Sequence, residues 1–322
     1  MRALPSHRML RFAAWLGALG FALPIPAAEL FAVRLPAWVS SVSFSPDGRH
    51  LAVGCADSVA RVLDAATGRE AVALRGHRDY VACVAFSPQG GLLASGSYDH
   101  TARLWNLAGQ RSTHTLAGHR GVVTSIAFSP DGKRLATGSL DGTVKLWDTT
   151  TGESGTTLRG HKSWLNAVAF SADGRWLISG SSDGTVAVWR TLPAKLQTTL
   201  DVTAVEVRSV AISADGKTIA AGLRYGTLKT WAFDTRREHM SVKAHDGDAS
   251  ALAFAPGGRT LISGGGDWDK PGMVKLWDTA TGKPGQSFRA SGEVLGVACS
   301  ADGRIVAAGC GDGTVTAWTL NP

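Results

Sequence analysis

Four segments of the chain each carry a histidine, a serine or threonine, an aspartate and a tryptophan at a repeated spacing. The sets are His77, Ser95, Asp99 and Trp105; His119, Thr137, Asp141 and Trp147; His161, Ser179, Asp183 and Trp189; and His245, Ser263, Asp267 or Asp269, and Trp277. Histidine, a hydroxyl and aspartate are the parts of a hydrolytic triad, in which histidine takes a proton from the nucleophile. A hydrolase needs one such nucleophile at a pocket, and four copies argue against that chemistry. We therefore predict a structural role for these residues and no catalytic residue among them.

Other motifs that could carry chemistry are weak. Gly180–Gly184 matches G-x-S-x-G, but the nucleophile elbow needs a strand-to-helix turn, and this match falls in a turn that recurs along the chain. Gly264-Gly265-Gly266 lacks the Lys-Ser/Thr of a phosphate-binding loop. The sequence has no His-Glu-x-x-His run, and its four cysteines are spaced for neither zinc nor haem. We expect no metal and no cofactor.

The tryptophan of each set marks a repeat that runs through most of the chain. The equivalent positions are Leu63, Trp105, Trp147, Trp189, Trp231, Trp277 and Trp318, at steps of 42, 42, 42, 42, 46 and 41 residues. Seven units of 42 residues account for the 294 residues of 29–322, which leaves no linker and no second domain. A period of this length is one supersecondary unit of a repeat protein.

Each unit has the pattern of four short strands separated by turns. In the third unit, Val123–Phe128, Arg134–Thr137 and Thr143–Trp147 are rich in strand-forming residues and are bounded by turn residues. Asp131-Gly132 follows the first of these strands and suits a type I′ hairpin turn, in which both central residues have positive φ. A second Asp-Gly, at 141–142, separates the next two strands. We expect four antiparallel strands of about five residues in each unit.

The same units carry motifs of a known family. Gly-His at 76–77, 118–119 and 160–161, with Trp-Asp at 147–148 and 277–278, resembles the WD-repeat family, and the resemblance covers residues 29–322. It implies an all-β fold, a seven-bladed β-propeller of four-stranded antiparallel blades. The seventh unit lacks its outer strand, and Leu30–Arg34 has a suitable length and composition to supply it. We predict that this N-terminal strand closes the ring.

The resemblance also assigns a role to the repeated polar residues. In the WD-repeat family they form a buried tetrad within a blade, in which aspartate accepts from histidine, histidine meets the hydroxyl, and the hydroxyl meets the indole N–H. Blades 1, 5 and 7 depart from this pattern, with Leu35, Val53, Asp57 and Leu63; Thr203, Ala221, Tyr225 and Trp231; and Ala290, Ala308, Asp312 and Trp318. We expect these three blades to be less rigid than the others.

The first 28 residues have the order of a secretory signal. Residues 1–11 are basic, residues 12–25 are mostly apolar, and Pro26-Ala27-Ala28 follow. The apolar run of about 14 residues is short for a spanning helix, which needs about 20. We predict a signal peptide at 1–28, a propeller at 29–322, a periplasmic or secreted location, and no stable membrane anchor after cleavage. An uncleaved segment on a cytoplasmic protein is the alternative.

The charge balance gives little support for a nucleic-acid partner. Lys and Arg exceed Asp and Glu by 33 to 26, a net charge of +7, and three of these positive charges lie in residues 1–28, which hold no acid. The remaining +4 is small and is spread along the chain. We expect no binding of nucleic acid.

In the WD-repeat family, partners usually meet the face that carries the Gly-His loops and the second Asp-Gly turns, which we call the loop face. Aromatic residues near these loops fall in blades 1, 2 and 4 and in an insertion of blade 6, and acids fall in blades 5, 6 and 7. Exposed aromatic residues beside charges are typical of interfaces. We predict that partners contact Trp38, Tyr80, Tyr98, Trp164, Asn166, Glu206, Arg208, Arg224, Asp248, Trp268 and Glu293.

These observations favour a non-enzymatic scaffold, a single monomeric ring that binds a protein or peptide. A ligand-binding or enzymatic propeller with its site at the channel mouth is the rival hypothesis, and Glu206, Asp248, Glu293 and Arg208 are its only candidate residues. Nothing in the sequence pairs them as acid and base. The repeats record the fold and do not identify the partner.

Overall fold

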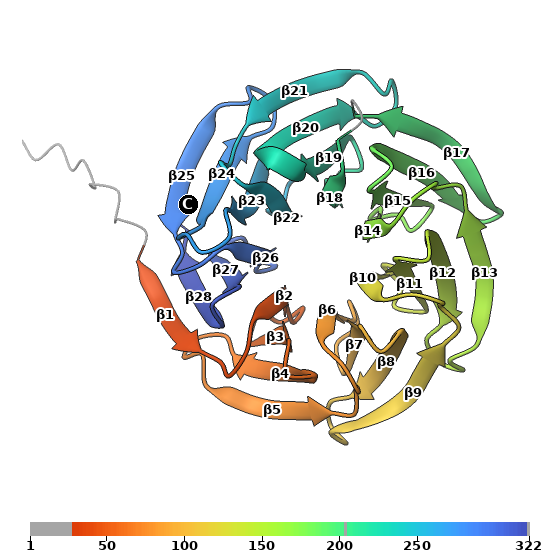
Figure 1. Cartoon of the computed structure of the whole chain (residues 1–322), viewed down its shortest axis with the longest axis vertical. Coiled ribbons are helices and arrows are strands. Elements are labelled where there is room, and N and C mark those ends of the chain that lie inside the picture. Colours follow the sequence, from red (N-terminus) through yellow and green to blue (C-terminus); the bar gives the residue numbers. More distant parts are fainter. Residues whose placement is uncertain (1–27, 203–204, 321–322) are drawn as a thin grey trace, which may run out of the picture.

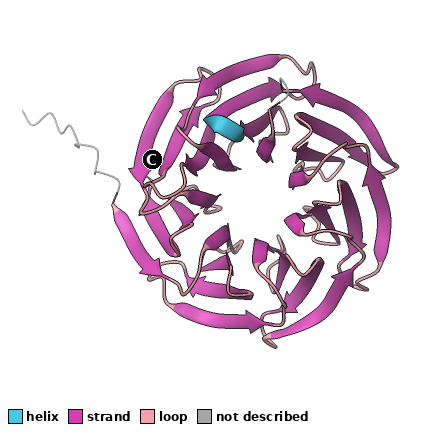
Figure 2. Ribbon diagram, in the orientation of Figure 1, coloured by secondary structure: helices cyan, strands magenta, loops and turns pink. Residues whose placement is uncertain are grey.

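The computed structural model describes residues 28–202 and 205–320, which form a ring of seven four-stranded antiparallel sheets (Figure 1). The predicted all-β, seven-bladed propeller is confirmed. Apart from turns and loops, this part of the chain consists of strands, and its one helical segment is the short 3-10 turn η1 (Arg224–Gly226), drawn in cyan in Figure 2.

Blades 1 to 6 each use four strands, a to d from the ring axis outward, that follow one another in the sequence. Blades 1 to 4 contain β2 (Val39–Phe44), β3 (His50–Cys55), β4 (Val59–Asp64) and β5 (Glu70–Arg75); β6 (Val81–Phe86), β7 (Leu92–Ser97), β8 (Thr101–Asn106) and β9 (Arg111–Ala117); β10 (Val123–Phe128), β11 (Arg134–Ser139), β12 (Thr143–Asp148) and β13 (Ser154–Arg159); β14 (Leu165–Phe170), β15 (Trp176–Ser181), β16 (Thr185–Thr191) and β17 (Ala194–Asp201). Blades 5 and 6 contain β18 (Val207–Ile212), β19 (Thr218–Leu223), β20 (Thr227–Ala232) and β21 (Glu238–Lys243); β22 (Asp248–Phe254), β23 (Thr260–Gly266), β24 (Met273–Asp278) and β25 (Pro284–Arg289).

Blade 7 is assembled from both ends of the described chain. Its strands are β26 (Val294–Cys299), β27 (Ile305–Cys310), β28 (Thr314–Thr319) and, as the outer strand d, β1 (Glu29–Arg34). β1 pairs antiparallel with β28 (Figure 1) and buries Phe31 against the same core as Leu51 and Val315. The predicted closure is confirmed, and the strand begins one residue earlier than expected.

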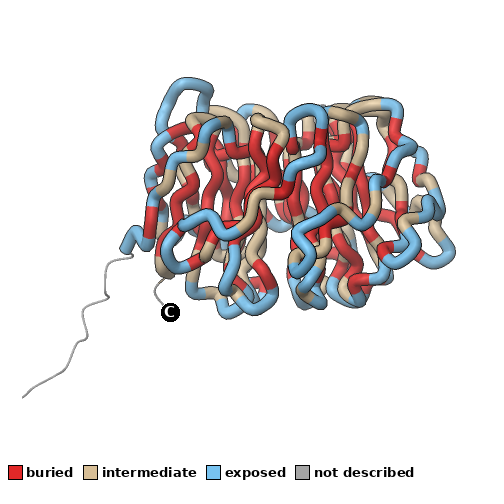
Figure 3. Tube along the Cα trace, turned by 90° about the horizontal axis from the view of Figure 1, so that it is seen from below, coloured by how far each residue is buried: buried red, intermediate tan, exposed pale blue. Residues whose placement is uncertain are grey.

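The core lies between the blades, because each sheet is covered on both faces by its neighbours. One cluster joins Ile178 and Val188 of blade 4 to Val207 and Ile219 of blade 5. Strand b of every blade is therefore buried on both sides, as in β11 (RLATGS), where every residue after Arg134 is buried. Figure 3 shows buried residues through the thickness of the ring and exposed loops on its two faces.

The first Asp-Gly turns differ from the predicted type I′ geometry. Gly132 has a φ of +69°, whereas Asp131 does not have a positive φ. The Gly132 amide donates to the Ser129 carbonyl over 2.8 Å, and the Ser129 hydroxyl donates to the Asp131 carboxylate over 2.5 Å. Aspartate is present here because its side chain holds the turn, and only the glycine needs the left-handed conformation.

The signal peptide predicted at 1–28 lies almost entirely outside the described residues. Within 28–202 and 205–320, no helix is both long and apolar enough to cross a membrane.

Candidate interaction face

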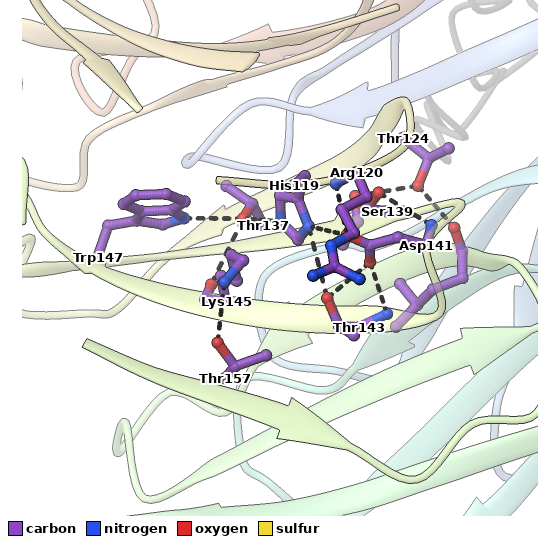
Figure 4. Close-up of polar contacts among 12 residues, drawn as sticks. His119, Arg120, Thr124, Thr137, Ser139, Asp141, Thr143, Lys145, Trp147 and Thr157 are labelled. Carbon is purple, nitrogen blue, oxygen red and sulfur yellow. Dashed lines mark hydrogen bonds and ion pairs between the residues drawn. The ribbon is translucent and has the colours of Figure 1, made fainter. Parts of the chain in front are cut away.

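Blades 2, 3 and 4 each contain one continuous chain of hydrogen bonds through four side chains (Figure 4, for blade 3). In blade 3, His119 Nδ1 lies 2.9 Å from the Asp141 carboxylate and its Nε2 lies 2.7 Å from the Thr137 hydroxyl. Trp147 Nε1 donates to the same hydroxyl over 2.8 Å. The sets built on His77 and His161 have the same contacts, with distances of 2.7–3.0 Å.

The hydroxyls of these networks are not placed for nucleophilic chemistry. Ser95, Thr137 and Ser179 are fully buried, so a substrate carbonyl cannot reach them. Burial lowers the pKa of His119, which favours a neutral ring that donates from Nδ1 and accepts at Nε2. Gly180–Gly184, the G-x-S-x-G match, lies at the hairpin turn between β15 and β16 rather than before a helix.

The aspartates of the networks tie two loops together. Burial alone raises the pKa of Asp141, but hydrogen bonds from Thr143, the Arg120 amide and His119 outweigh it and hold the pKa at about 2. Through these bonds Asp141 joins the loop before strand a to the turn between strands b and c. The Leu140 amide also donates to the Val122 carbonyl over 3.0 Å. In blades 2, 3 and 4, these hydrogen bonds therefore hold together the two loops that form the loop face.

Blade 6 does not contain the fourth predicted tetrad. Ser263 receives a hydrogen bond from Trp277 Nε1 and lies 2.9 Å from His245 Nε2. Asp267, however, is exposed and pairs with Lys270 over 2.6 Å instead of meeting His245. The insertion in this turn moves the aspartate away from the histidine. Burial, with help from Lys275, lowers the pKa of His245 to about 4.

Blade 1 replaces the tetrad with two ion pairs of one buried arginine. Arg61, only 4% exposed, donates to Asp57 over 2.9 Å and to Glu70 over 3.0 Å. The hydrogen bonds to Asp57 raise the pKa of Arg61, and the same bonds lower the pKa of the Asp57 carboxyl group. Strands c and d of blade 1 are therefore held by polar contacts of a different kind from those expected. In blade 5, Thr203 lies outside the described residues.

Most of the exposed aromatic surface lies on the loop face. Among the described residues, eight large apolar or aromatic side chains are exposed, and six of them lie in loops before strand a or in turns between strands b and c. These six are Trp38, Tyr80, Tyr98, Trp164, Tyr225 and Trp268. The other two are Leu30, on the edge strand β1, and Leu192, on the opposite face.

The structure pairs several of the predicted aromatic residues. Tyr80 and Tyr98 of blade 2 lie with ring centroids 5.6 Å apart. Trp38 of blade 1 meets Trp268 of the blade 6 insertion, with centroids 5.1 Å apart and ring planes at 79°. This second pair reaches across blade 7. Trp164 is 59% exposed.

Most of the acidic residues that the sequence places on the loop face of blades 5, 6 and 7 form ion pairs with arginines. Arg208 pairs with Glu206 over 3.2 Å and with Asp248 over 2.9 Å, and Arg224 pairs with Glu206 over 2.8 Å and lies over the Tyr225 ring. The sequence could not show that Arg208 lies beside Asp248, because the two residues come from different blades. Glu293 is the exception, since no lysine, arginine or histidine of the described residues forms an ion pair with it.

Asn166 occupies a position that joins neighbouring blades. Its amide donates to the Val207 carbonyl over 2.8 Å and to the Ser182 hydroxyl over 2.9 Å. Ser40 and Thr124, at the equivalent positions of blades 1 and 3, donate to the next blade in the same way. Asn166 therefore links blades 4 and 5, and its side-chain NH₂ group already donates two hydrogen bonds within the protein.

Sequence reasoning missed a cavity over blade 7. It has a volume of about 290 Å³ and lies between Trp38 and Trp268, with Ser291, Gly292, Glu293 and Gly311 along it. The sequence feature that indicates this cavity is Gly311, a glycine at the position where blade 2 has Tyr98 and blade 3 has Leu140. No group of three or more metal-ligating side chains occurs in 28–202 and 205–320.

Seven four-stranded sheets in a closed ring, with the same buried network in blades 2, 3 and 4, define a β-propeller. A family profile described as "IFT122 first beta-propeller" matches residues 108–321, and one described as "WD domain, G-beta repeat" matches residues 33–64 and 68–106. The chain therefore belongs to the WD-repeat family of β-propellers. A comparison with curated proteins found no match.

Proposed function

We propose that this protein is a non-enzymatic scaffold that binds a protein or peptide partner through the loop face. WD-repeat propellers commonly act as protein-interaction scaffolds. The observation that carries the proposal here is that six of the eight exposed large apolar or aromatic side chains lie on one face of the ring. Aromatic side chains supply large, rigid contact areas and dominate interface energies.

The arrangement of charges supports binding rather than catalysis. The acids near the mouth of the ring, Glu206 and Asp248, are engaged with Arg208 and Arg224. The repeated hydroxyls are buried. Within the described residues we find no nucleophile beside a base at an accessible pocket, which is what acyl-transfer chemistry requires.

The binding proposal is tested by selecting peptides from a random library on the immobilised protein and measuring their affinities by isothermal titration calorimetry. The test variant is Trp38→Ala/Trp268→Ala, and the control is Leu192→Ser, on the opposite face. We expect the double variant to lose at least about tenfold in affinity, as for hot-spot residues, and the control to bind normally. Failure to select any peptide, or equal binding by the double variant, would contradict the proposal.

We also propose that the protein is exported, on the basis of the basic, apolar and small-residue order of residues 1–28. Mass spectrometry of the native protein from separated cell fractions tests this. A start at Ala28 or Glu29 in a soluble exported fraction is expected. A start at Met1 in the cytoplasmic fraction would show that the segment is retained and that the partner is to be sought inside the cell.

A further inference from the structure

Blade 7 forms a hollow on the loop face because its loops are built from small residues. Gly311 lies between strands b and c, where blades 2, 3 and 5 carry a tyrosine, a leucine and an arginine, and Ser291-Gly292 lie in the loop before strand a. A Cβ atom on Gly311 would meet no atom closer than 3.7 Å, so a side chain is absent but sterically allowed. The hollow therefore exists because this position lacks a side chain, and the backbone there does not require a glycine.

The neighbouring blades supply aromatic walls to this hollow. Trp38 and Trp268 are each about half exposed, and their ring planes are nearly perpendicular, at 79°. Two rings in this arrangement make a corner in which one compact group can touch both. The cavity of about 290 Å³ is at the lower end of the sizes of ligand sites, about 300–1,000 Å³.

The charges around the cavity are predominantly negative. Glu293, Asp269 and Asp312 line it together with one cation, Lys270, which is already paired with Asp267 over 2.6 Å. Glu293 is half-buried and has no ion-pair partner among the described residues. Burial and the nearby Asp248 and Asp267 raise the pKa of its carboxyl group, and the opposing effect of Arg208 is smaller.

We infer that this cavity binds the ammonium group of a lysine side chain of the partner, held in the corner formed by the indoles of Trp38 and Trp268 and paired with Glu293. The inference rests on the proposed function and specifies its partner. An ammonium ion is attracted to the faces of aromatic rings, most strongly to tryptophan, and more so where water is excluded. A carboxylate in the same cavity adds the opposite charge.

The shape of the site favours a lysine over an arginine. A guanidinium group is flat and stacks on one ring, whereas the compact ammonium group fits a corner formed by two perpendicular rings. The lysine stem is apolar and can lie along an indole while its charged end reaches Glu293. A purely apolar side chain would leave Glu293 desolvated without a partner, which is unfavourable.

The first test uses small probes and the indole N–H signals of the tryptophans in a nuclear magnetic resonance titration. The probes are the Nα-acetyl methylamides of lysine, arginine and the neutral isostere norleucine. We expect lysine to shift the Trp38 and Trp268 signals saturably, and norleucine to bind at least about tenfold more weakly. Equal binding by norleucine, or stronger binding by arginine, would overturn the inference.

Two variants locate the site. Glu293→Gln keeps the shape of the side chain and removes its charge, and Gly311→Leu fills the cavity with the residue that blade 3 has at that position. Both should weaken binding of the lysine probe by about tenfold or more, while Leu192→Ser, at an exposed turn on the opposite face, should not. Unchanged thermal unfolding establishes that each variant is folded. Undiminished binding by both folded variants would overturn the inference.

The outcomes separate this inference from the proposed function. If selected peptides bind the loop face but keep their affinity when lysine is replaced by norleucine, the inference fails and the scaffold proposal stands. If the lysine probe binds but no peptide does, the scaffold proposal fails and the cation site stands. A dimer in sedimentation that Gly311→Leu abolishes would show that a second copy fills the cavity, and would overturn the inference.

Discussion

At the scale of single residues, one aspartate determines how two loops meet on the loop face. Asp141 accepts hydrogen bonds from His119, Thr143 and the Arg120 amide, and these groups come from strands and loops that are separate in the sequence. Removing one partner of a buried network leaves the others unsatisfied, and this penalty exceeds the loss of a single contact. The network therefore fixes the positions of the two loops and also stabilises the fold.

Asp141→Ala should lower the free energy of unfolding by about 1.5–3 kcal/mol, the range for hydrogen bonds to a charged group. Asp267→Ala is the matched control, because Asp267 is exposed and lies outside the blade 6 network. Denaturant unfolding of both variants measures the effect. Equal destabilisation by the two substitutions would show that the networks do not carry the stability assigned to them.

His245 should make the stability of the protein depend on pH. Its pKa is lowered by burial to about 4 in the folded protein and is near 6.5 in an unfolded chain. Between these values the unfolded state binds more protons than the folded state. The free energy of unfolding therefore falls as the pH is lowered from 6.5 to 4, by up to about 1.4 kcal/mol per pH unit for this group.

The variant His245→Asn should have a shallower pH dependence than the wild type over this range. Chemical unfolding at several pH values between 6.5 and 4 measures the difference. Wild type and variant curves of the same slope would mean that His245 is protonated equally in the folded and unfolded states.

The positions of the site residues could be predicted from the sequence, but their contacts could not. The repeat places Trp38, Trp164 and Trp268 on one face, because register within a 42-residue unit determines the loop to which a residue belongs. It does not show that Arg208 neutralises Asp248, since that ion pair joins two blades and depends on side-chain rotamers. The insertion changes the register of blade 6, which is why Asp267 was assigned to the wrong partner.

At the scale of strands, β1 is the outermost strand of blade 7 and joins the first and last parts of the described chain. It pairs with β28 from Glu29 to Arg34 and buries Phe31. Without β1, the backbone groups of β28 would be left unpaired at a sheet edge, and such edges recruit other chains.

Deletion of residues 29–34 should therefore produce a protein that aggregates, as measured by light scattering and size-exclusion chromatography. Replacing the exposed Leu30 with Ser, which keeps the strand and its pairing, is the control and should remain monomeric. A well-folded monomer after the deletion would show that closure by β1 is not needed.

Blades differ in the polar contacts that hold them, and this difference should be measurable by hydrogen exchange. Blades 2 to 4 have complete networks, blade 1 has the Arg61 ion pairs, and blade 7 has alanines where histidine and serine stand elsewhere. We expect slower exchange in β11 and β12 than in β27 and β28. Equal protection in these strands would contradict this expectation.

At the scale of the whole molecule, the fold follows from the sequence because the same signals recur seven times. A weak strand pattern becomes reliable when it returns in register, and the seven sheets confirm it. What the protein binds does not follow in this way, because the binding surface that we propose is formed by residues that break the repeat. Gly311 and the insertion that carries Trp268 are such departures, and together they make the cavity.

A hydrogen-exchange map of the whole protein, with and without a peptide selected for binding, tests most directly whether the loop face binds the partner. We expect added protection in the loops before strand a and in the turns between strands b and c, strongest around Trp38, Trp268 and Glu293. Protection confined to the turns between strands c and d, near Leu192, would contradict it, because those turns lie on the opposite face of the ring.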